Sequence, residues 1–187
     1  KYIDLNGHVS PVYSDSIVMD TTAPTGTVSI NGGSAITAST AVTLTLSCTD
    51  AGSGCSQMQL SKDNITWDAA ETYATTKSYT LPTGDGVKTV YVKYKDNIGK
   101  WSATYNDTIT VDATVPTGTI TINSNASYAN TAAVTLTLSC TDAGSGCSQM
   151  QFSNDNVAWS VAETYATSKS YTLSTGDGVK TVYAKFK

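Results

Sequence analysis

Apolar and polar residues alternate with a period of two along most of the chain, and no stretch has the 3.6-residue period of an amphipathic helix. In residues 42–48, Val42, Leu44, Leu46 and Cys48 share one side, while threonine and serine fill the other. This pattern predicts a strand with one buried and one solvated face. Similar segments predict further strands over residues 27–30, 57–60, 77–81, 87–95 and 105–111.

Turn-forming residues separate these segments, in runs such as Asn31-Gly32-Gly33 and Gly84-Asp85-Gly86. About seven short strands in 92 residues, with turns between them, predict an all-β fold, an antiparallel sandwich of two sheets. In this sandwich we expect Trp67 and Trp159 to pack in the core, and Tyr91 and Tyr183 to point outward.

The sequence repeats itself with an offset of 92 residues. Residues 43–59 recur without change at 135–151, and the alignment of 20–95 with 112–187 has 53 identities in 76 positions. No insertion or deletion is needed, and residues 1–19 follow the same register. A fixed period of this kind predicts a tandem array of copies of one domain.

The repeat predicts domain boundaries that are out of phase with the ends of the chain. Residues 1–19 form the last strand of a preceding Ig-like repeat, 20–111 a complete repeat, and 112–187 a repeat without its final strand. One interpretation is a window on a longer array. The alternative is a subunit whose residues 1–19 complete the unfinished domain of the next subunit by strand addition.

The joints between repeats, 20–26 and 112–118, are short and contain Pro24 and Pro116. Proline fixes φ and pushes the residue before it into an extended conformation. We therefore expect a semi-rigid joint, and an array of these domains would be a rod.

Composition narrows the function. The chain has 11 lysines and no arginine, a net charge of -4, 32 threonines and 22 serines. A nucleic-acid binder needs a basic face, so none is expected here. No apolar run approaches 18 residues, so no membrane span is expected in this segment.

Candidate acid–base groups are few. The one histidine, His8, falls in a turn and is expected to be solvated, and the only glutamates, Glu71 and Glu163, are expected to hydrogen bond to the backbone. Near-identical repeats also argue against a unique catalytic site, so we do not expect an enzyme.

Several motifs resemble bacterial immunoglobulin-like surface repeats. They are Asp-Thr-Thr-Ala-Pro-Thr-Gly at 20–26, Leu-Thr-Leu-Ser-Cys-Thr-Asp-Ala-Gly-Ser-Gly at 44–54, Ser-Asn-Asp-Asn with Trp159 from 153, and the run at 91–102 that ends in Lys-Trp-Ser. The resemblance covers the whole chain. It implies an Ig-like or fibronectin-III-like sandwich, export from the cell, and a stalk, adhesin or filament role. Cys55 and Cys147 depart from it, since that position is commonly apolar in such repeats.

The four cysteines form two identical pairs, Cys48 with Cys55 and Cys140 with Cys147, each around the sequence Thr-Asp-Ala-Gly-Ser-Gly. Glycines permit a tight bend there, and an even count in an exported protein favours a local disulfide in each repeat. Two buried free thiols per repeat are the alternative. A zinc site is disfavoured because it needs four ligands and no histidine is near.

Aspartates in the turns and joints are candidate calcium ligands, because carboxylate oxygens are the hard donors that calcium prefers. The candidates are Asp20, Asp50, Asp96, Asp112 and Asp142, with Asp4 at the corresponding joint position. The alternative is that these side chains only cap their own backbone turns. No other cofactor is expected.

These observations predict an extracellular or cell-surface structural or adhesive protein, a rod, stalk or filament of Ig-like domains. Its partners would be neighbouring repeats, and it could self-associate into fibres. The alternative is a binding module that recognises surface glycans or proteins through exposed loops and tyrosines.

Overall fold

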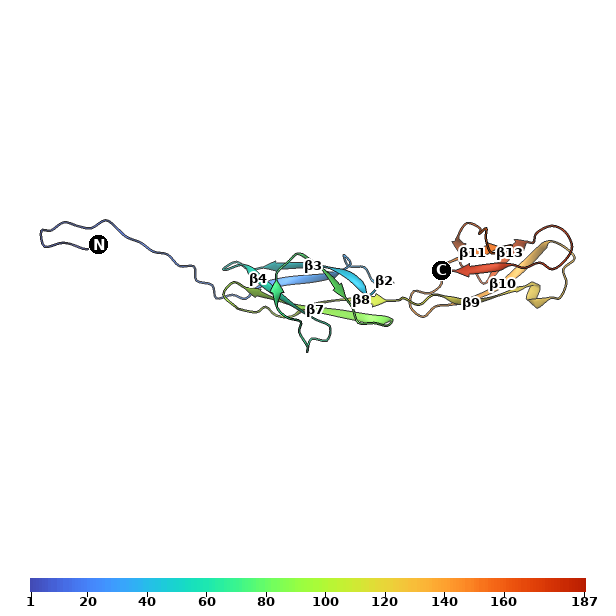
Figure 1. Ribbon diagram of the computed structural model, residues 1–187, viewed down its shortest axis with the longest axis horizontal. Coiled ribbons are helices and arrows are strands. Elements are labelled where there is room, and N and C mark those ends of the chain that lie inside the picture. The colour runs from blue at the N-terminus through green and yellow to red at the C-terminus, as the bar shows by residue number, and fades with distance from the viewer. The chain divides into compact units, whose positions relative to one another are not determined.

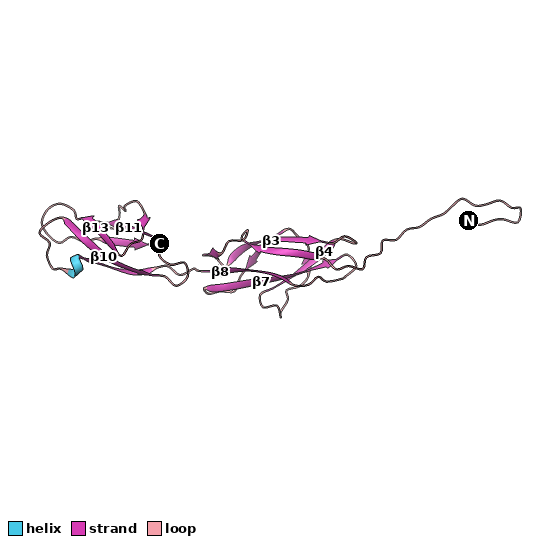
Figure 2. Ribbon diagram, turned by 180° about the vertical axis from the view of Figure 1, so that it is seen from behind, coloured by secondary structure: helices cyan, strands magenta, loops and turns pink.

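We describe a computed structural model of all 187 residues, Lys1–Lys187. Strands and loops make up almost the whole chain, and one short 3-10 helix is present (Figure 2). No helix is long and apolar enough to cross a membrane. The chain divides into two compact units, one with most of the first repeat and the other with the second repeat and segments 34–40, 82–88 and 109–111 of the first. The two repeats are described separately.

The first repeat contains eight strands in two sheets. The strands are β1 (Thr25–Ile30), β2 (Ile36–Thr37), β3 (Ala41–Thr49), β4 (Cys55–Ser61), β5 (Glu71–Thr72), β6 (Thr76–Thr80), β7 (Gly86–Asp96) and β8 (Tyr105–Val111). One sheet has the order β1-β3-β6 and the other β2-β8-β7-β4-β5. In Figure 1, β3 lies in one layer and β7 in the other.

The predicted alternation sets which face of each strand is buried. In β3, Val42, Leu44 and Leu46 are buried while the threonines and serine between them are exposed. In β7, Val90, Val92 and Tyr94 are buried in the same alternating way. The predicted all-β sandwich is therefore confirmed. The strand bounds differ from the predicted ones by at most two residues at either end.

The sheet order is that of an immunoglobulin-like or fibronectin-III-like domain. All strand pairs with a defined register are antiparallel except one, in which β2 runs parallel to β8 and Ile36 faces Thr110. After β1 the chain thus crosses to the other sheet, where β2 lies beside β8. The periodicity of the sequence did not indicate β2 or β5, because a two-residue strand has no alternation to detect.

Tyr94 is at the centre of the first core. Its side chain is fully buried, its hydroxyl donates a hydrogen bond of 2.5 Å to the carbonyl of Thr27, and its ring meets that of Tyr73 edge-on at 5.7 Å. The ring covers Gly26, where a Cβ would lie 2.4 Å from Tyr94 Cε2. A side chain at position 26 is therefore excluded, which explains why glycine interrupts a strand.

The second repeat contains β9 (Thr117–Ile122), the 3-10 helix η1 (Asn123–Asn125), β10 (Ala133–Thr141), β11 (Gln149–Ser153), β12 (Glu163–Thr164), β13 (Ser168–Thr172) and β14 (Tyr183–Phe186). Its sheets have the orders β13-β10-β9 and β12-β11-β14. They match β6-β3-β1 and β5-β4-β7, and there is no counterpart of β2 or β8.

A groove of about 690 Å³ marks the part of the second repeat that lacks these strands. Ile122 and Leu173 line it and are partly exposed, whereas their counterparts Ile30 and Leu81 are 0% and 1% exposed. The core that does form contains Val134, Leu136, Leu138, Met150, Phe152 and Val182. The second repeat thus has the same sheets as the first with one side of its core open.

Residues 1–19 are exposed along almost their whole length, including Leu5, Ile17 and Met19. The only bridge within them pairs Ile3 with Val9 around a turn. Ile17 and Met19, which correspond to the buried Ile109 and Val111 of β8, are thus exposed.

Candidate functional site

A disulfide-closed loop joins β3 to β4 in the first repeat. Cys48 and Cys55 are bonded, with their Cα atoms 6.3 Å apart, and Cys140 and Cys147 form the same bond in the second repeat. No cysteine is free. The structure thus has the local disulfides that the sequence favoured over free thiols.

Asp50 organises the inside of this loop. Its Oδ1 accepts hydrogen bonds from the amides of Gly52 at 3.2 Å, Ser53 at 2.9 Å and Gly54 at 2.7 Å. Its other oxygen, Oδ2, is buried and has no hydrogen-bond partner. One side of the carboxylate therefore folds the loop while the other side is left unused.

Asp20, from the joint that precedes β1, lies against the same loop. Its Oδ2 accepts the Ser53 amide at 2.9 Å, and its Oδ1 accepts the Thr22 amide at 3.0 Å. A Cβ on Gly52 would lie 2.3 Å from Asp20 Cγ, so only glycine allows this approach. The Ser53 side chain and the Thr22 amide hold the pKa of Asp20 below its usual range.

Asp96, the last residue of β7, is the third member. Its Oδ1 accepts the amides of Ile98 at 3.0 Å and Lys100 at 2.7 Å, which closes the turn after β7. The residue is only 1% exposed, and its Oδ2 is buried without a hydrogen-bond partner. Asn97 ties this turn to the disulfide loop through a 2.6 Å bond from its Nδ2 to the Ser53 carbonyl.

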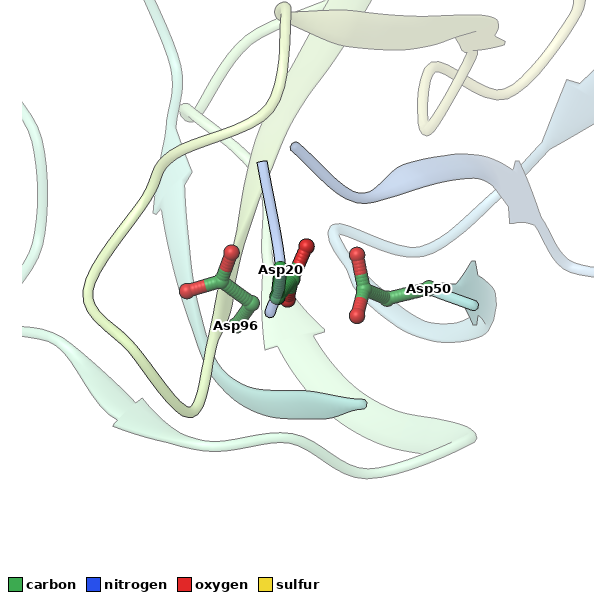
Figure 3. Close-up of side chains that lie close together, drawn as sticks. All are labelled: Asp20, Asp50 and Asp96. Atoms are coloured by element: carbon green, nitrogen blue, oxygen red, sulfur yellow. The ribbon is translucent and has the colours of Figure 1, made fainter. Parts of the chain in front are cut away.

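The structure brings these three carboxylates together. One oxygen from each of Asp20, Asp50 and Asp96 lies within 4.8 Å of the others, and the side chains come from three separate segments (Figure 3). The ion pairs of the chain are His8–Asp4, Lys77–Glu71 and Lys169–Glu163, so no lysine or histidine neutralises the cluster. We call these three residues the aspartate cluster.

The second repeat contains two members of the same arrangement. Asp142 Oδ1 accepts the amides of Gly144, Ser145 and Gly146, and Asp112 lies against Gly144, where a Cβ would be 2.2 Å from Asp112 Cγ. Asp112 Oδ1 and Asp142 Oδ2 are buried without hydrogen-bond partners.

Two opposing effects, burial and amide hydrogen bonds, set the pKa of the Asp142 carboxyl group. Burial acts to raise the pKa of Asp142, but the amides of Gly146, Ser145 and Gly144 outweigh it and keep the pKa below its usual value. A carboxylate with three amides on one oxygen stays ionised at neutral pH. The disulfide loop of the second repeat thus presents a negative charge.

The five predicted calcium ligands therefore fall into two sets, Asp20 with Asp50 and Asp96, and Asp112 with Asp142. Asp4, at the position of Asp96 in the preceding register, bonds the amides of Asn6 and His8 and also the His8 ring at 2.8 Å. His8 is exposed, and its side chain lowers the pKa of Asp4. Sequence reasoning missed Gly52 and Asn97, which bring the segments of the aspartate cluster together.

Two expectations about other side chains are wrong. Trp67 and Trp159 are not core residues but partly exposed, with Lys93 Nζ 4.0 Å from the Trp67 ring centroid and Lys185 Nζ 3.9 Å from that of Trp159. A lysine on the outer face covers each indole through a cation–π contact. Alternation misassigned them because they lie in irregular segments.

Glu71 and Glu163 form ion pairs rather than the expected backbone hydrogen bonds. Lys77 Nζ lies 2.7 Å from Glu71 and Lys169 Nζ 2.5 Å from Glu163. Each pair links an edge strand of one sheet to an edge strand of the other sheet in its repeat. Both glutamates are thus members of ion pairs.

Comparisons with known proteins bear on the fold. No model of a known protein family matches the sequence, and neither does any curated protein. Among solved structures, the chain is similar to the fibronectin(III)-like modules of Clostridium thermocellum CbhA. The match covers 85% of each chain with 14% identity and a TM-score of 0.43. The sandwich assignment therefore rests on the strand pairing, and the resemblance to bacterial tandem surface repeats stays a prediction.

Proposed function

We propose that this chain belongs to an extracellular structural protein in which Ig-like domains follow one another as a rod, stalk or filament. The observation that supports this most strongly is that three local stabilising interactions occur in both repeats. The disulfide loop, the Glu–Lys pair and the Lys–Trp contact all occur twice at the same positions. Devices of this kind stabilise a domain, and an array needs them in each copy.

The disulfides support a location outside the reducing interior of the cell. Each closes a loop with a sequence separation of 7 and is part of the β3–β4 or β10–β11 connection. Structural disulfides persist in oxidising compartments and are rare in the cytosol. An exported repeat protein fits this chemistry.

Hydrogen bonds to the joint between repeats support a stiff connection. Asp85, in the turn between β6 and β7, accepts bonds from the Ala113 amide at 2.9 Å and from the Thr114 hydroxyl. The Thr114 hydroxyl and the Ala113 amide lower the pKa of Asp85, so the carboxylate stays charged as an acceptor. Pro116 restricts the same segment.

Immunogold labelling of intact producing cells tests this proposal. An antibody against the folded repeat should label the cell surface or extracellular fibres without permeabilisation. Label that appears only after permeabilisation would contradict the proposal. Specific binding of soluble protein to a glycan array, with no fibres or surface rods, would instead favour a binding module.

A further inference from the structure

We propose that Asp20, Asp50 and Asp96 bind one calcium ion, and that Asp112 and Asp142 belong to the same kind of site in the second repeat. The site joins the segment that enters a repeat to the disulfide loop and to the end of β7. It would be present in a single repeat as well as in a rod, so it does not depend on the function proposed above.

The two oxygens of Asp50 and of Asp96 have different surroundings. In Asp50 and Asp96 one oxygen accepts every local amide bond, and the other is buried with no partner. A turn-capping role explains the first oxygen only. Asp96 is only 1% exposed, so water does not readily satisfy its second oxygen.

The aspartate cluster concentrates negative charge. Three carboxylates lie within 4.8 Å of one another, and no ion pair from a lysine or histidine reaches them. Like charges at this separation repel, and burial strengthens the repulsion. A bound cation relieves the repulsion and also supplies the partner that the buried oxygens lack.

The second repeat has a similar arrangement of carboxylates. The second repeat leaves Asp112 Oδ1 and Asp142 Oδ2 buried and unpaired, although Asp112 is only 7% exposed. Gly144 permits the close approach of Asp112, as Gly52 does for Asp20. The unpaired Oδ2 of Asp142 thus matches that of Asp50 in the first repeat.

The ligand set of the cluster favours calcium over magnesium. Calcium–oxygen distances of about 2.3–2.6 Å place ligands on opposite sides of the ion roughly 4.6–5.2 Å apart. Magnesium–oxygen distances near 2.1 Å give only about 4.2 Å and require a regular octahedron. The aspartate cluster offers three carboxylates from one chain within 4.8 Å of one another, whereas magnesium is usually bound through one or two carboxylates and keeps several waters.

Isothermal titration calorimetry and thermal unfolding of the whole chain test the site, with calcium chloride as the probe after treatment with a chelator. We expect binding in the range of about 0.1–1 mM, as in other extracellular modules. At 10 mM calcium, the melting temperature of the first repeat should rise by at least about 5 °C.

Matched variants separate the site from general effects of losing an aspartate. Asp96→Asn and Asp20→Asn should each weaken calcium binding at least about tenfold. Asp63→Asn is the control, because Asp63 caps the turn at Ile65 and Thr66 but lies outside the aspartate cluster. Asp20 precedes β1, so its variant keeps the test valid if Asp96→Asn does not fold.

Three results would overturn the proposal. They are no binding heat together with no thermal shift in calcium, equal binding by Asp20→Asn and the unsubstituted chain, and equal loss of binding in Asp63→Asn. Magnesium binding as tight as calcium binding would overturn the choice of ion.

Discussion

The contact between Gly26 and Tyr94 leads to a quantitative prediction. In Gly26→Ala the new Cβ would lie 2.3 Å from the Ser47 carbonyl oxygen and 2.4 Å from Tyr94 Cε2, so the ring or the strand must move. Tyr94 is fully buried and bonded to Thr27, so its ring has no free space. Overpacking costs about 1–3 kcal/mol, and strain in the Tyr94–Thr27 hydrogen bond costs about 1 kcal/mol more. The free energy of unfolding of the first repeat should therefore fall by roughly 2–4 kcal/mol.

Gly118→Ala is the matched change in the second repeat. Its Cβ would lie 2.4 Å from the Ser139 carbonyl oxygen and 2.5 Å from Phe186 Cε2. Phe186 is only partly buried and has no hydroxyl to anchor it, so its ring can turn toward solvent. We expect a smaller loss, about 1–2 kcal/mol.

Hydrogen exchange with mass spectrometry measures both changes within the full chain, because β7 and β14 give distinguishable peptides. Gly26→Ala should speed exchange in β7 by roughly 30- to 1000-fold, and Gly118→Ala should speed exchange in β14 by roughly 5- to 30-fold. Each variant leaves the other repeat as its internal control. An increase of less than about threefold in the exchange rate of β7 in Gly26→Ala would contradict overpacking at Tyr94. A larger effect of Gly118→Ala would contradict it as well.

Three further predictions follow from the fold. Replacing Cys48 and Cys55 by serine should lower the free energy of unfolding by about 2.5 kcal/mol in urea titration, and no change would contradict a structural disulfide. Burial, with the nearby Asp68 charge, raises the pKa of Tyr79 to about 12, so stability present below the unfolded pKa near 10 should fall as pH rises from about 10 to 12. Tyr79→Phe should reduce that fall, and an unchanged pH profile of unfolding would argue against it. A peptide of residues 100–112, which contains β8, should bind in the groove of the second repeat and slow amide hydrogen exchange in β14. The same slowing by a scrambled peptide would contradict binding as a β8-like strand.

The strands with one buried face were predictable from the sequence. Val42, Leu44 and Leu46 alternate with threonine and serine, and the burial of β3 follows that pattern residue by residue. The 92-residue offset carried the same assignment to β10. Local periodicity succeeded there because each strand has a dry face and a wet face.

The side chains outside regular strands were not predictable in the same way. Trp67 follows a turn, where no alternation indicates its orientation, and Lys93 on the neighbouring strand determines that it is covered from outside. Glu71 belongs to a two-residue strand, and its partner Lys77 is next to it only after the sheets form.

The aspartate cluster was predictable in its chemistry and only partly in its geometry. Donor type singled out Asp20, Asp50 and Asp96, but they are up to 76 positions apart in the sequence. Their meeting depends on the order of β1, β3, β4 and β7 and on the space at Gly52. The topology therefore decides which of the candidate aspartates share one site.

Electron microscopy of the purified native protein tests the central claim, a rod of stacked Ig-like domains, most directly. The 11 residues of β7 span about 36 Å, so the account predicts unbranched rods with an axial repeat of about 4 nm. Compact particles without axial repeat, or domains joined at freely varying angles, would contradict it.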